Sequence, residues 1–365
     1  MLNILLILVM ENKKKRIEYL DIAKGLAIIG VVLCHSMTNN DYIFDIIHPT
    51  LHNWFCFFCV STFFMINGML YSEKAVEHPF MSILKRLKSY YIPYLGFNLA
   101  FYIFHNLWVD VHFLSDNKFG PKEFVIGLIR LLLGEMQPLT GPMWFMRALI
   151  VISIIYILID SVSYRAFGGK YRYLINGIVV GAIFILGALI NLPGTFNFDD
   201  GCRSLFIYMF GVIFRKYDLN RYIKKYNIAF FASLLVITVI MSNIFYVGLL
   251  PSINYPIYVL SQILGVTMAI SGAQIPVIEK SKVLKLLGNS SLDIMALHFF
   301  SFKFISLLII GIYGLDIKFL EDIPIIKTEI NDFCVIAYLL IGLLLPTCFS
   351  LVRLRVLEKI KDSKK

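Results

Sequence analysis

Long runs of apolar residues alternate with short polar segments along the whole of this chain. Ten of these runs approach the length of about 20 residues that an α-helix needs to cross a bilayer. They lie at about residues 20–37, 52–71, 90–109, 143–162, 173–192, 202–214, 228–249, 256–275, 291–312 and 333–352. The pattern predicts an all-α fold, a polytopic membrane helix bundle with about ten transmembrane helices.

The composition agrees with a membrane protein. The 365 residues are 58% hydrophobic and 16% charged, with a mean hydropathy of +0.76, which lies outside the range of ordinary soluble domains. A net charge of +10 is also found in nucleic-acid-binding proteins. Membrane proteins, however, collect Lys and Arg in their cytoplasmic loops, so the positions of the charges decide between the two classes.

Lys and Arg gather in alternate polar segments. Six segments hold 25 of the 34 Lys and Arg residues: 11–19, 72–89, 163–172, 215–227, 276–290 and 353–365. Because Lys and Arg favour the cytoplasmic side of a membrane, this alternation predicts that both termini are cytoplasmic. It also favours counting the short run 202–214 as a crossing. The positive charge is thus explained without a nucleic-acid partner.

The pattern divides the chain into a cytoplasmic N-terminal segment over residues 1–19, a membrane domain over 20–352 and a basic cytoplasmic tail over 353–365. Residues 1–9 form an apolar run that is too short to span a membrane. A signal peptide has basic residues before its apolar region, and this run has none. We interpret residues 1–9 as the product of an upstream start codon. The segment "KEFVIGLIRLLLGE" at 122–135 has helical apolar spacing, which predicts a helix at the membrane interface.

Two ionisable residues interrupt the first apolar run, "LDIAKGLAIIGVVLCHS" at 20–36. Ionisable groups in hydrocarbon are costly and usually mark a pathway or a reaction site. Lys24 and His35 are eleven residues apart, so a helix places them on one face, about 16 Å apart along its axis. That distance is close to the reach of a pantetheine arm. Asp21, one turn before Lys24, can orient or neutralise its ammonium group.

The segment resembles the first helix of the membrane acyltransferase-3 group of O-acyltransferases, particularly the fucose 4-O-acetylase-like branch. That helix carries Leu-Asp, an Arg, ten residues and a His, and the matching residues here are Leu20, Asp21, Lys24 and His35. Further matches are "LKRLKSYYIPY" at 84–94, "GPMWFMRALI" at 141–150 and "SLDIMALHFF" at 291–300. The resemblance covers about residues 17 to 350.

The resemblance implies transfer of an acetyl group from cytoplasmic acetyl-CoA to a sugar hydroxyl of a cell-surface polysaccharide or its lipid-linked precursor. The expected partners are that glycan and the lipids of the cell (plasma or inner) membrane, with no metal and no nucleic acid. The oligomeric state is left open. His35 is the candidate general base, because a neutral imidazole can accept the hydroxyl proton. Histidine can also be a nucleophile, so an acetyl-histidine intermediate is the alternative.

The resemblance assigns roles to residues outside the first helix as well. The cations that would bind CoA are Lys24, Lys85, Arg86 and Lys88. At the position of Lys24 the family usually has Arg, and at the position of "KRLK" it usually has Arg-x-x-Arg. Lysine keeps the charge but loses bidentate phosphate binding, and which of the three later cations acts is open. His298 would bind the thioester or complete a proton path. Trp144 would face a sugar ring, and Arg147 would bind a polar part of the acceptor.

Each of these residues also has a purely structural interpretation. Lys24 can snorkel to the interface, the "KRLK" cluster is an ordinary positive-inside signal, and Trp144 is typical of an interface anchor. His35 and His298 can be histidines satisfied inside the bundle. The rival function is a transporter or flippase for a polar or lipid-linked substrate. Transporters often contain inverted repeats and Gly- or Pro-broken helix pairs, and neither is evident here.

Overall fold

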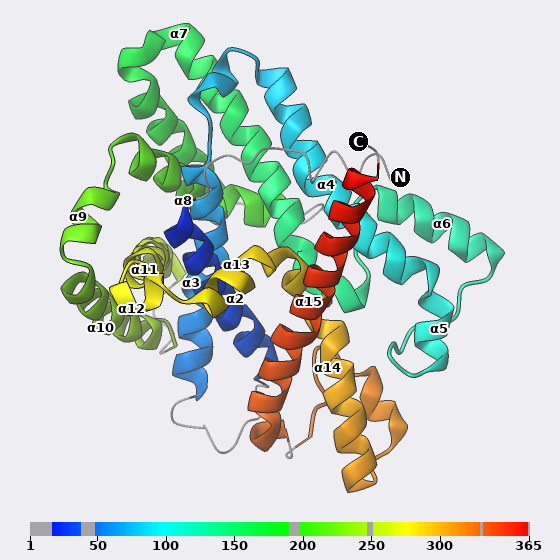
Figure 1. Cartoon of the computed structure of the whole chain (residues 1–365). Helices are drawn as coiled ribbons and strands as arrows, with labels where there is room; N and C mark the ends of the chain where they lie inside the picture. Colours follow the sequence, from blue (N-terminus) through cyan, green and yellow to red (C-terminus); the bar gives the residue numbers. More distant parts are fainter. Residues whose placement is uncertain (1–16, 38–47, 190–197, 247–250, 329–330, 364–365) are drawn as a thin grey trace. The chain divides into compact units, whose positions relative to one another are not determined.

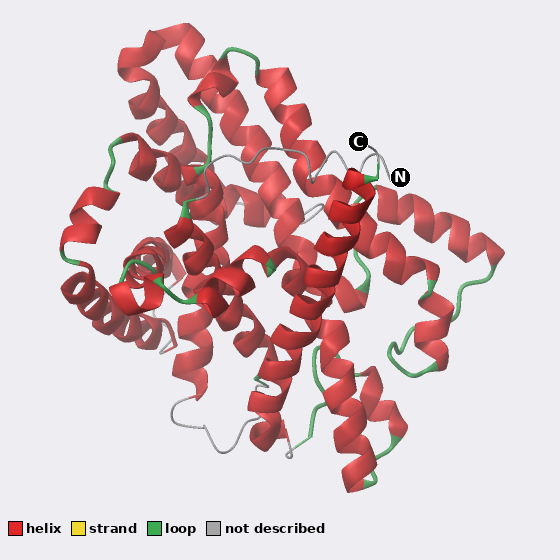
Figure 2. Ribbon diagram, viewed as in Figure 1, coloured by secondary structure: helices red, strands yellow, loops and turns green. Residues whose placement is uncertain are grey.

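The structure is a computed structural model that describes residues 17–37, 48–189, 198–246, 251–328 and 331–363. Within these residues the regular secondary structure is entirely helical, as Figure 2 shows. The prediction of an all-α fold is therefore confirmed. Residues 1–9, with their proposed upstream start, lie outside the described part of the chain.

The described part of each of the ten predicted apolar runs lies largely in helix. The α-helices are α2 (Glu18–Ser36), α3 (His48–Met69), α4 (Pro79–Ile103), α5 (His105–Asp110), α6 (Pro121–Leu132), α7 (Trp144–Leu189), α8 (Phe198–Lys216), α9 (Asn220–Lys225), α10 (Asn227–Tyr246), α11 (Pro251–Gly272), α12 (Pro276–Glu279), α13 (Lys282–Asn289), α14 (Ser291–Tyr313) and α15 (Asn331–Asp362). The described part of the chain also contains the 3-10 helices η2 (Glu73–Val76), η3 (Pro138–Met143) and η5 (Ile317–Glu321).

Two predicted crossings share α7. They are separated at Gly168, whose φ of +67° interrupts the helix and which carries no Cβ to oppose that conformation. The predicted interfacial helix is α6, which begins with Gly120 and Pro121 and exposes Val125, Ile129 and Leu132. Proline is favoured at the first position of a helix because its missing N–H would have no partner there.

Among the described residues, four stretches of helix are long and apolar enough to cross a membrane: Glu18–Ser36, Pro138–Leu186, Ser291–Tyr313 and Cys334–Ile360. Shorter apolar helices cover Phe58–Met69, Asn227–Met241 and Val259–Gly272. These helices account for most of the predicted runs, while the number of crossings stays a prediction. The described chain is a membrane-type helical bundle.

The helices form two compact units. Unit 1 contains residues 1–48, 96–142 and 279–365, and unit 2 contains residues 49–95 and 143–278. In unit 1, α2 contacts α13, α14 and α15, and α14 packs along α15 (Figure 1). In unit 2, α7 packs on α8 and α10 packs on α11.

Glycines allow α13 to lie directly on the first turns of α2. A Cβ added to Gly288 would lie 1.8 Å from the carbonyl oxygen of Asp21, and one added to Gly25 would lie 2.1 Å from the carbonyl oxygen of Leu284. Only a residue without a Cβ permits such backbone contact. Ser281 caps α13 by accepting a hydrogen bond from the amide of Leu284. The start of α2, which carries Asp21 and Lys24, is thereby fixed against a second helix.

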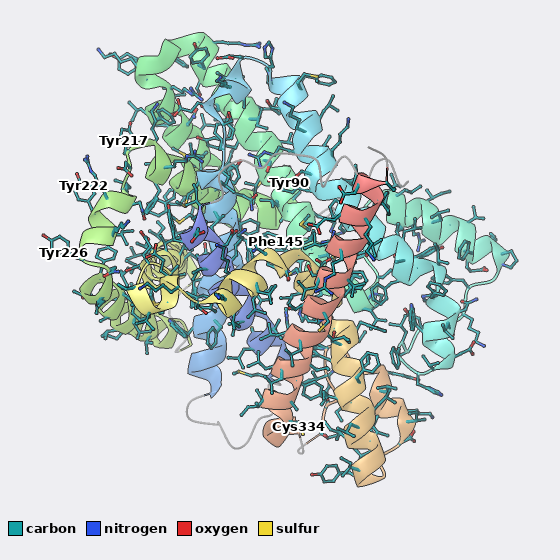
Figure 3. All side chains as sticks on the ribbon, viewed as in Figure 1. Tyr90, Phe145, Tyr217, Tyr222, Tyr226 and Cys334 are labelled. Atoms are coloured by element: carbon teal, nitrogen blue, oxygen red, sulfur yellow. The ribbon has the colours of Figure 1, made fainter. Side chains whose placement is uncertain are left out.

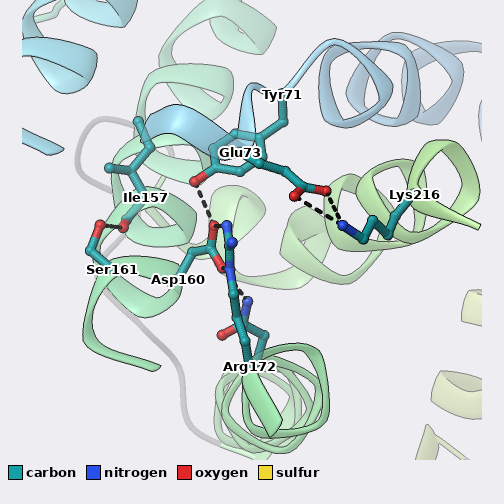
Figure 4. A network of polar contacts seen from close by, with 8 residues as sticks. Tyr71, Glu73, Ile157, Asp160, Ser161, Arg172 and Lys216 are labelled. Atoms are coloured by element: carbon teal, nitrogen blue, oxygen red, sulfur yellow. Dashed lines mark hydrogen bonds and ion pairs between the residues drawn. The ribbon is translucent and has the colours of Figure 1, made fainter. Parts of the chain in front are cut away.

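A buried polar network holds unit 2 together. Asp160 of α7 pairs with Arg172 across the break at Gly168, and it accepts hydrogen bonds from Tyr71 at 2.7 Å and from Asn176 at 2.7 Å. Figure 4 shows this arrangement. Because Asp160 and Asn176 are fully buried, each donor satisfies a carboxylate that would otherwise be costly to bury. The network fixes the chain that follows α3 against both arms of α7.

Candidate functional site

Two histidines from distant parts of the sequence meet in unit 1. His35 is the penultimate residue of α2, and His298 lies 263 residues later in α14. The Nδ1 atom of His35 lies 3.0 Å from Nε2 of His298, and the two rings stack with their centroids 5.2 Å apart. His298 is fully buried, while His35 is half-buried. Two residues predicted separately from the sequence thus form a hydrogen-bonded pair.

The hydrogen bonds of His298 determine which nitrogen of His35 carries a proton. Nδ1 of His298 lies 2.7 Å from the carbonyl oxygen of Ile294. Since a carbonyl oxygen can only accept, Nδ1 of His298 donates, and Nε2 of the neutral ring is an acceptor. The hydrogen between the rings therefore belongs to Nδ1 of His35. A neutral His35 then has no proton on Nε2, which is the form a general base needs.

Aromatic side chains hold the pair in place. The ring of Phe299 lies edge-on to His35 at 5.0 Å and to His298 at 4.9 Å, and Phe302 lies 5.6 Å from His298. Gly141, at the start of the "GPMWFMRALI" stretch, faces this wall, since a Cβ there would lie 3.2 Å from the Phe299 ring. Packed rings restrict the rotation of both imidazoles, so the donor and acceptor atoms are pre-positioned.

Asp21 and Lys24 form an ion pair at the other end of α2. The Nζ atom of Lys24 lies 2.6 Å from Oδ1 of Asp21, and the side chains are 25% and 8% exposed. The structure thus places the carboxylate where the sequence predicted it, one turn before the lysine. An ammonium group that is partly exposed can exchange its partner for an incoming anion.

Sequence reasoning did not single out two buried charges on α14. Asp293 is 1% exposed and accepts two hydrogen bonds from Arg353 of α15, at 3.0 and 2.7 Å. Lys303 is fully buried and donates to the carbonyl oxygens of Leu320 and Asp322. These contacts fix both ends of the α14 segment that carries His298. The sequence does contain a signal for the pair of Asp293 and Arg353. Asp293 lies at the start of one apolar run, and Arg353 directly follows the end of another.

The three predicted cations of "KRLK" lie in unit 2, on the first half of α4. Lys85 and Lys88 are exposed, whereas Arg86 turns inward. The Nη1 atom of Arg86 donates to the hydroxyl of Tyr90 at 2.6 Å, and that hydroxyl donates to Asn67 of α3 at 2.8 Å. The sequence left open which cation acts. The structure distinguishes a fixed arginine from two lysines that are open to solvent.

Trp144 and Arg147 are also in unit 2, at the start of α7. They are three residues apart and therefore on neighbouring positions of one helical face, and both are half-buried. The predicted site residues are thus divided between the two units: Asp21, Lys24, His35 and His298 in unit 1, and the others in unit 2. Among the described residues, no group of three or more His, Cys, Asp or Glu could hold a metal ion.

A family model described as an acyltransferase domain, the acyltransferase-3 model, matches residues 17–353. This match covers almost the whole chain and includes every predicted site residue. The chain belongs to the membrane acyltransferase-3 family. No curated protein and no solved structure shows a significant match to it. The membership makes this protein an integral-membrane acyltransferase, in which the paired histidines are the candidate catalytic groups.

Proposed function

We propose that this acyltransferase moves an acetyl group from cytoplasmic acetyl-CoA to a sugar hydroxyl of a cell-surface polysaccharide or its lipid-linked precursor. The observation that carries the proposal is the hydrogen-bonded chain from His35 through His298 to the carbonyl of Ile294. It leaves Nε2 of His35 as the proton-accepting nitrogen, in the way that an orienting group sets the tautomer of the histidine in a catalytic triad.

The reaction needs one proton to move twice. As the sugar oxygen attacks the thioester carbon, the hydroxyl proton passes to Nε2 of His35. The tetrahedral intermediate then collapses, the carbon–sulfur bond breaks, and the same proton passes to the sulfur of CoA. Between these steps His35 is an imidazolium, and its Nδ1–H bond to His298 becomes charge-assisted and stronger. His298 therefore stabilises the charged state of the base as well as its orientation.

Lys24 supplies a cation at the cytoplasmic end of the same helix. Eleven residues of α-helix span about 16 Å, so phosphates held near Lys24 allow the pantetheine arm to reach His35. Asp21 pairs with Lys24 and neutralises it when CoA is absent. When CoA binds, its phosphates replace Asp21 as the partner of Lys24. In unit 2, Arg86 with its fixed partner Tyr90 is a stronger candidate for phosphate binding than the exposed Lys85 and Lys88. Trp144 and Arg147 are proposed to contact the acceptor.

The test measures free CoA released from acetyl-CoA by the purified protein in nanodiscs, with a cell-envelope glycan fraction as acceptor. The variant is His35→Ala, and the matched control is His78→Gln, which changes an exposed histidine. General acid–base catalysis contributes about 100- to 10,000-fold, so we expect a loss of that size in His35→Ala and none in the control. Acetyl-CoA binding, measured by equilibrium dialysis, stays close to wild type.

Two results would count against the proposal. Full acceptor-dependent CoA release in His35→Ala would exclude His35 as the base. If the wild-type protein neither binds nor turns over acetyl-CoA with any of several glycan fractions, the transporter hypothesis takes precedence.

A further inference from the structure

A polar cavity of about 340 Å³ lies in unit 2, and none of the residues given a role in the proposed function above lines it. It is open to solvent on one side and is lined by the end of α3, the start of η2 and the last turns of α8. Its lining residues are Gly68, Tyr71, Ser72, Glu73, Val212, Arg215 and Lys216. Two of the seven are cations and one is an anion, so the cavity carries a net positive charge.

Arg215 lies at the wall of the cavity and is held there by a hydrogen bond to the end of α3. Its Nη1 atom donates to the carbonyl oxygen of Met69 at 2.8 Å, which caps the last turn of α3. A guanidinium group has five N–H donors in a planar fork, and this bond uses one of them. The arrangement fixes the arginine and leaves most of its fork to bind an oxyanion.

Lys216 is held by Glu73 on the opposite wall. Its Nζ atom lies 2.9 and 3.0 Å from the two carboxylate oxygens of Glu73 (Figure 4). Burial by itself would raise the pKa of Glu73, but the hydrogen bond and the positive charge of Lys216 outweigh it and lower that pKa below its usual value. Glu73 is therefore charged at neutral pH. Its carboxylate lines the cavity and is paired with Lys216, the cation to which an incoming anion would bind.

The wall that carries Glu73 is rigid. Tyr71, two residues earlier, is buried and donates to Asp160, which Arg172 and Asn176 hold in turn. The cavity is thus largely preformed, as small-molecule sites usually are. Both basic segments that border it, 72–89 and 215–227, are predicted to be cytoplasmic from the distribution of Lys and Arg.

We propose that this cavity binds a phosphate group, with Arg215 and Lys216 as its ligands and Glu73 as the anion that the phosphate displaces from Lys216. An arginine fork beside a lysine suits the oxygens of a phosphate. The phosphate has two possible sources at a cytoplasmic membrane surface: the 3′-phosphate of an acyl-CoA, or the headgroup of an anionic lipid. Only the first source rests on the function proposed above.

The experiment measures binding rather than turnover, so it is independent of acetyl transfer. Wild type, Arg215→Gln, Lys216→Gln and Glu73→Gln are titrated with CoA and with dephospho-CoA, which lacks only the 3′-phosphate. In parallel, native mass spectrometry measures retention of phosphatidic acid against phosphatidylcholine. Lys224→Gln on α9 is the matched control, because it removes one exposed charge outside the cavity. The neighbouring side chains of Tyr222 and Tyr226 project outward there (Figure 3).

We expect Arg215→Gln and Lys216→Gln each to weaken binding of the phosphate ligand about tenfold or more. Glu73→Gln acts in the opposite direction and tightens binding several-fold, because it removes the competing carboxylate. If the source is acyl-CoA, the preference for CoA over dephospho-CoA disappears in the two cation variants. If it is a lipid, the preference for phosphatidic acid disappears instead.

The opposite sign expected for Glu73→Gln separates a ligand role from a structural one, since damage to the fold would weaken binding in all three variants. The side chains of Lys216 and Glu73 are 39% and 44% exposed, so these two variants are suitable even if Arg215→Gln does not fold. The proposal is overturned if both cation variants match Lys224→Gln for both ligands, if Glu73→Gln weakens binding, or if the wild type prefers neither phosphate ligand.

Discussion

Replacement of His298 by leucine tests the chemistry of the histidine pair most directly. Leucine fills similar space in the apolar wall of Phe299 and Phe302 but has no atom that can accept a hydrogen bond. The N–H at Nδ1 of His35, whose nitrogen lies 3.0 Å from Nε2 of His298, would lose its acceptor. His35 would remain in place with its ring less well oriented and its charged form less well stabilised.

The size of the effect follows from that one hydrogen bond. In the resting state it joins two neutral rings, and such bonds contribute about 0.5–1.5 kcal/mol net. When His35 takes the hydroxyl proton, the bond gains a charged donor and rises to about 1.5–3 kcal/mol. The unpaired N–H also costs more to bury when the ring is charged, and this difference adds to the loss. Since about 1.4 kcal/mol is tenfold in rate, we expect His298→Leu to lower kcat/KM about 10- to 100-fold, less than His35→Ala.

The assay is acceptor-dependent release of CoA, with acetyl-CoA binding and thermal unfolding measured on the same samples. His298→Gln is the control for structure, because its amide oxygen can accept the hydrogen bond from His35. We expect its rate to lie between those of the leucine variant and the wild type. A rate within twofold of wild type for His298→Leu would refute this reasoning, as would a glutamine variant no faster than the leucine variant at equal stability.

Two further predictions concern the start of α2. Lys24→Ala removes the partly exposed cation that pairs with Asp21. In steady-state kinetics we expect KM for acetyl-CoA to rise about tenfold, with kcat little changed. The control Lys282→Ala, which replaces an exposed lysine on α13, should leave both constants unchanged. Gly288→Ala places a Cβ against the carbonyl oxygen of Asp21 and should cost about 1–3 kcal/mol by overpacking, seen as a lower unfolding midpoint. Gly96→Ala, where a Cβ meets nothing within 4 Å, should not lower it.

The helices could be predicted from the sequence because apolar length is a local property. The described part of each of the ten runs lies largely in helix, and the run that carries Lys24 and His35 became α2 with nearly the predicted bounds. The position of α13 on α2 could not be predicted. It depends on backbone contacts at Gly25 and Gly288, and an isolated glycine in an apolar or basic segment does not indicate which helix lies against it.

Of the two histidines, His35 could be predicted from sequence spacing alone. His35 is in phase with Lys24 on one helix, and both lie in a single apolar run. His298 needed the family pattern, because no local signal links residues 263 positions apart. The direction of the hydrogen bond between them depends on the carbonyl of Ile294, and no sequence pattern specifies such a contact.

Ionisable residues in apolar runs do not by themselves mark a reaction site. Asp160 and Lys303 satisfy the same sequence criterion as Lys24, yet their partners lie inside the fold. Asp160 is paired with Arg172, Tyr71 and Asn176, and Lys303 donates to two backbone carbonyls. Lys24 is partly exposed and held by one carboxylate. Access to solvent therefore distinguishes Lys24 from Asp160 and Lys303, and Arg215 and Lys216 are exposed to solvent as well.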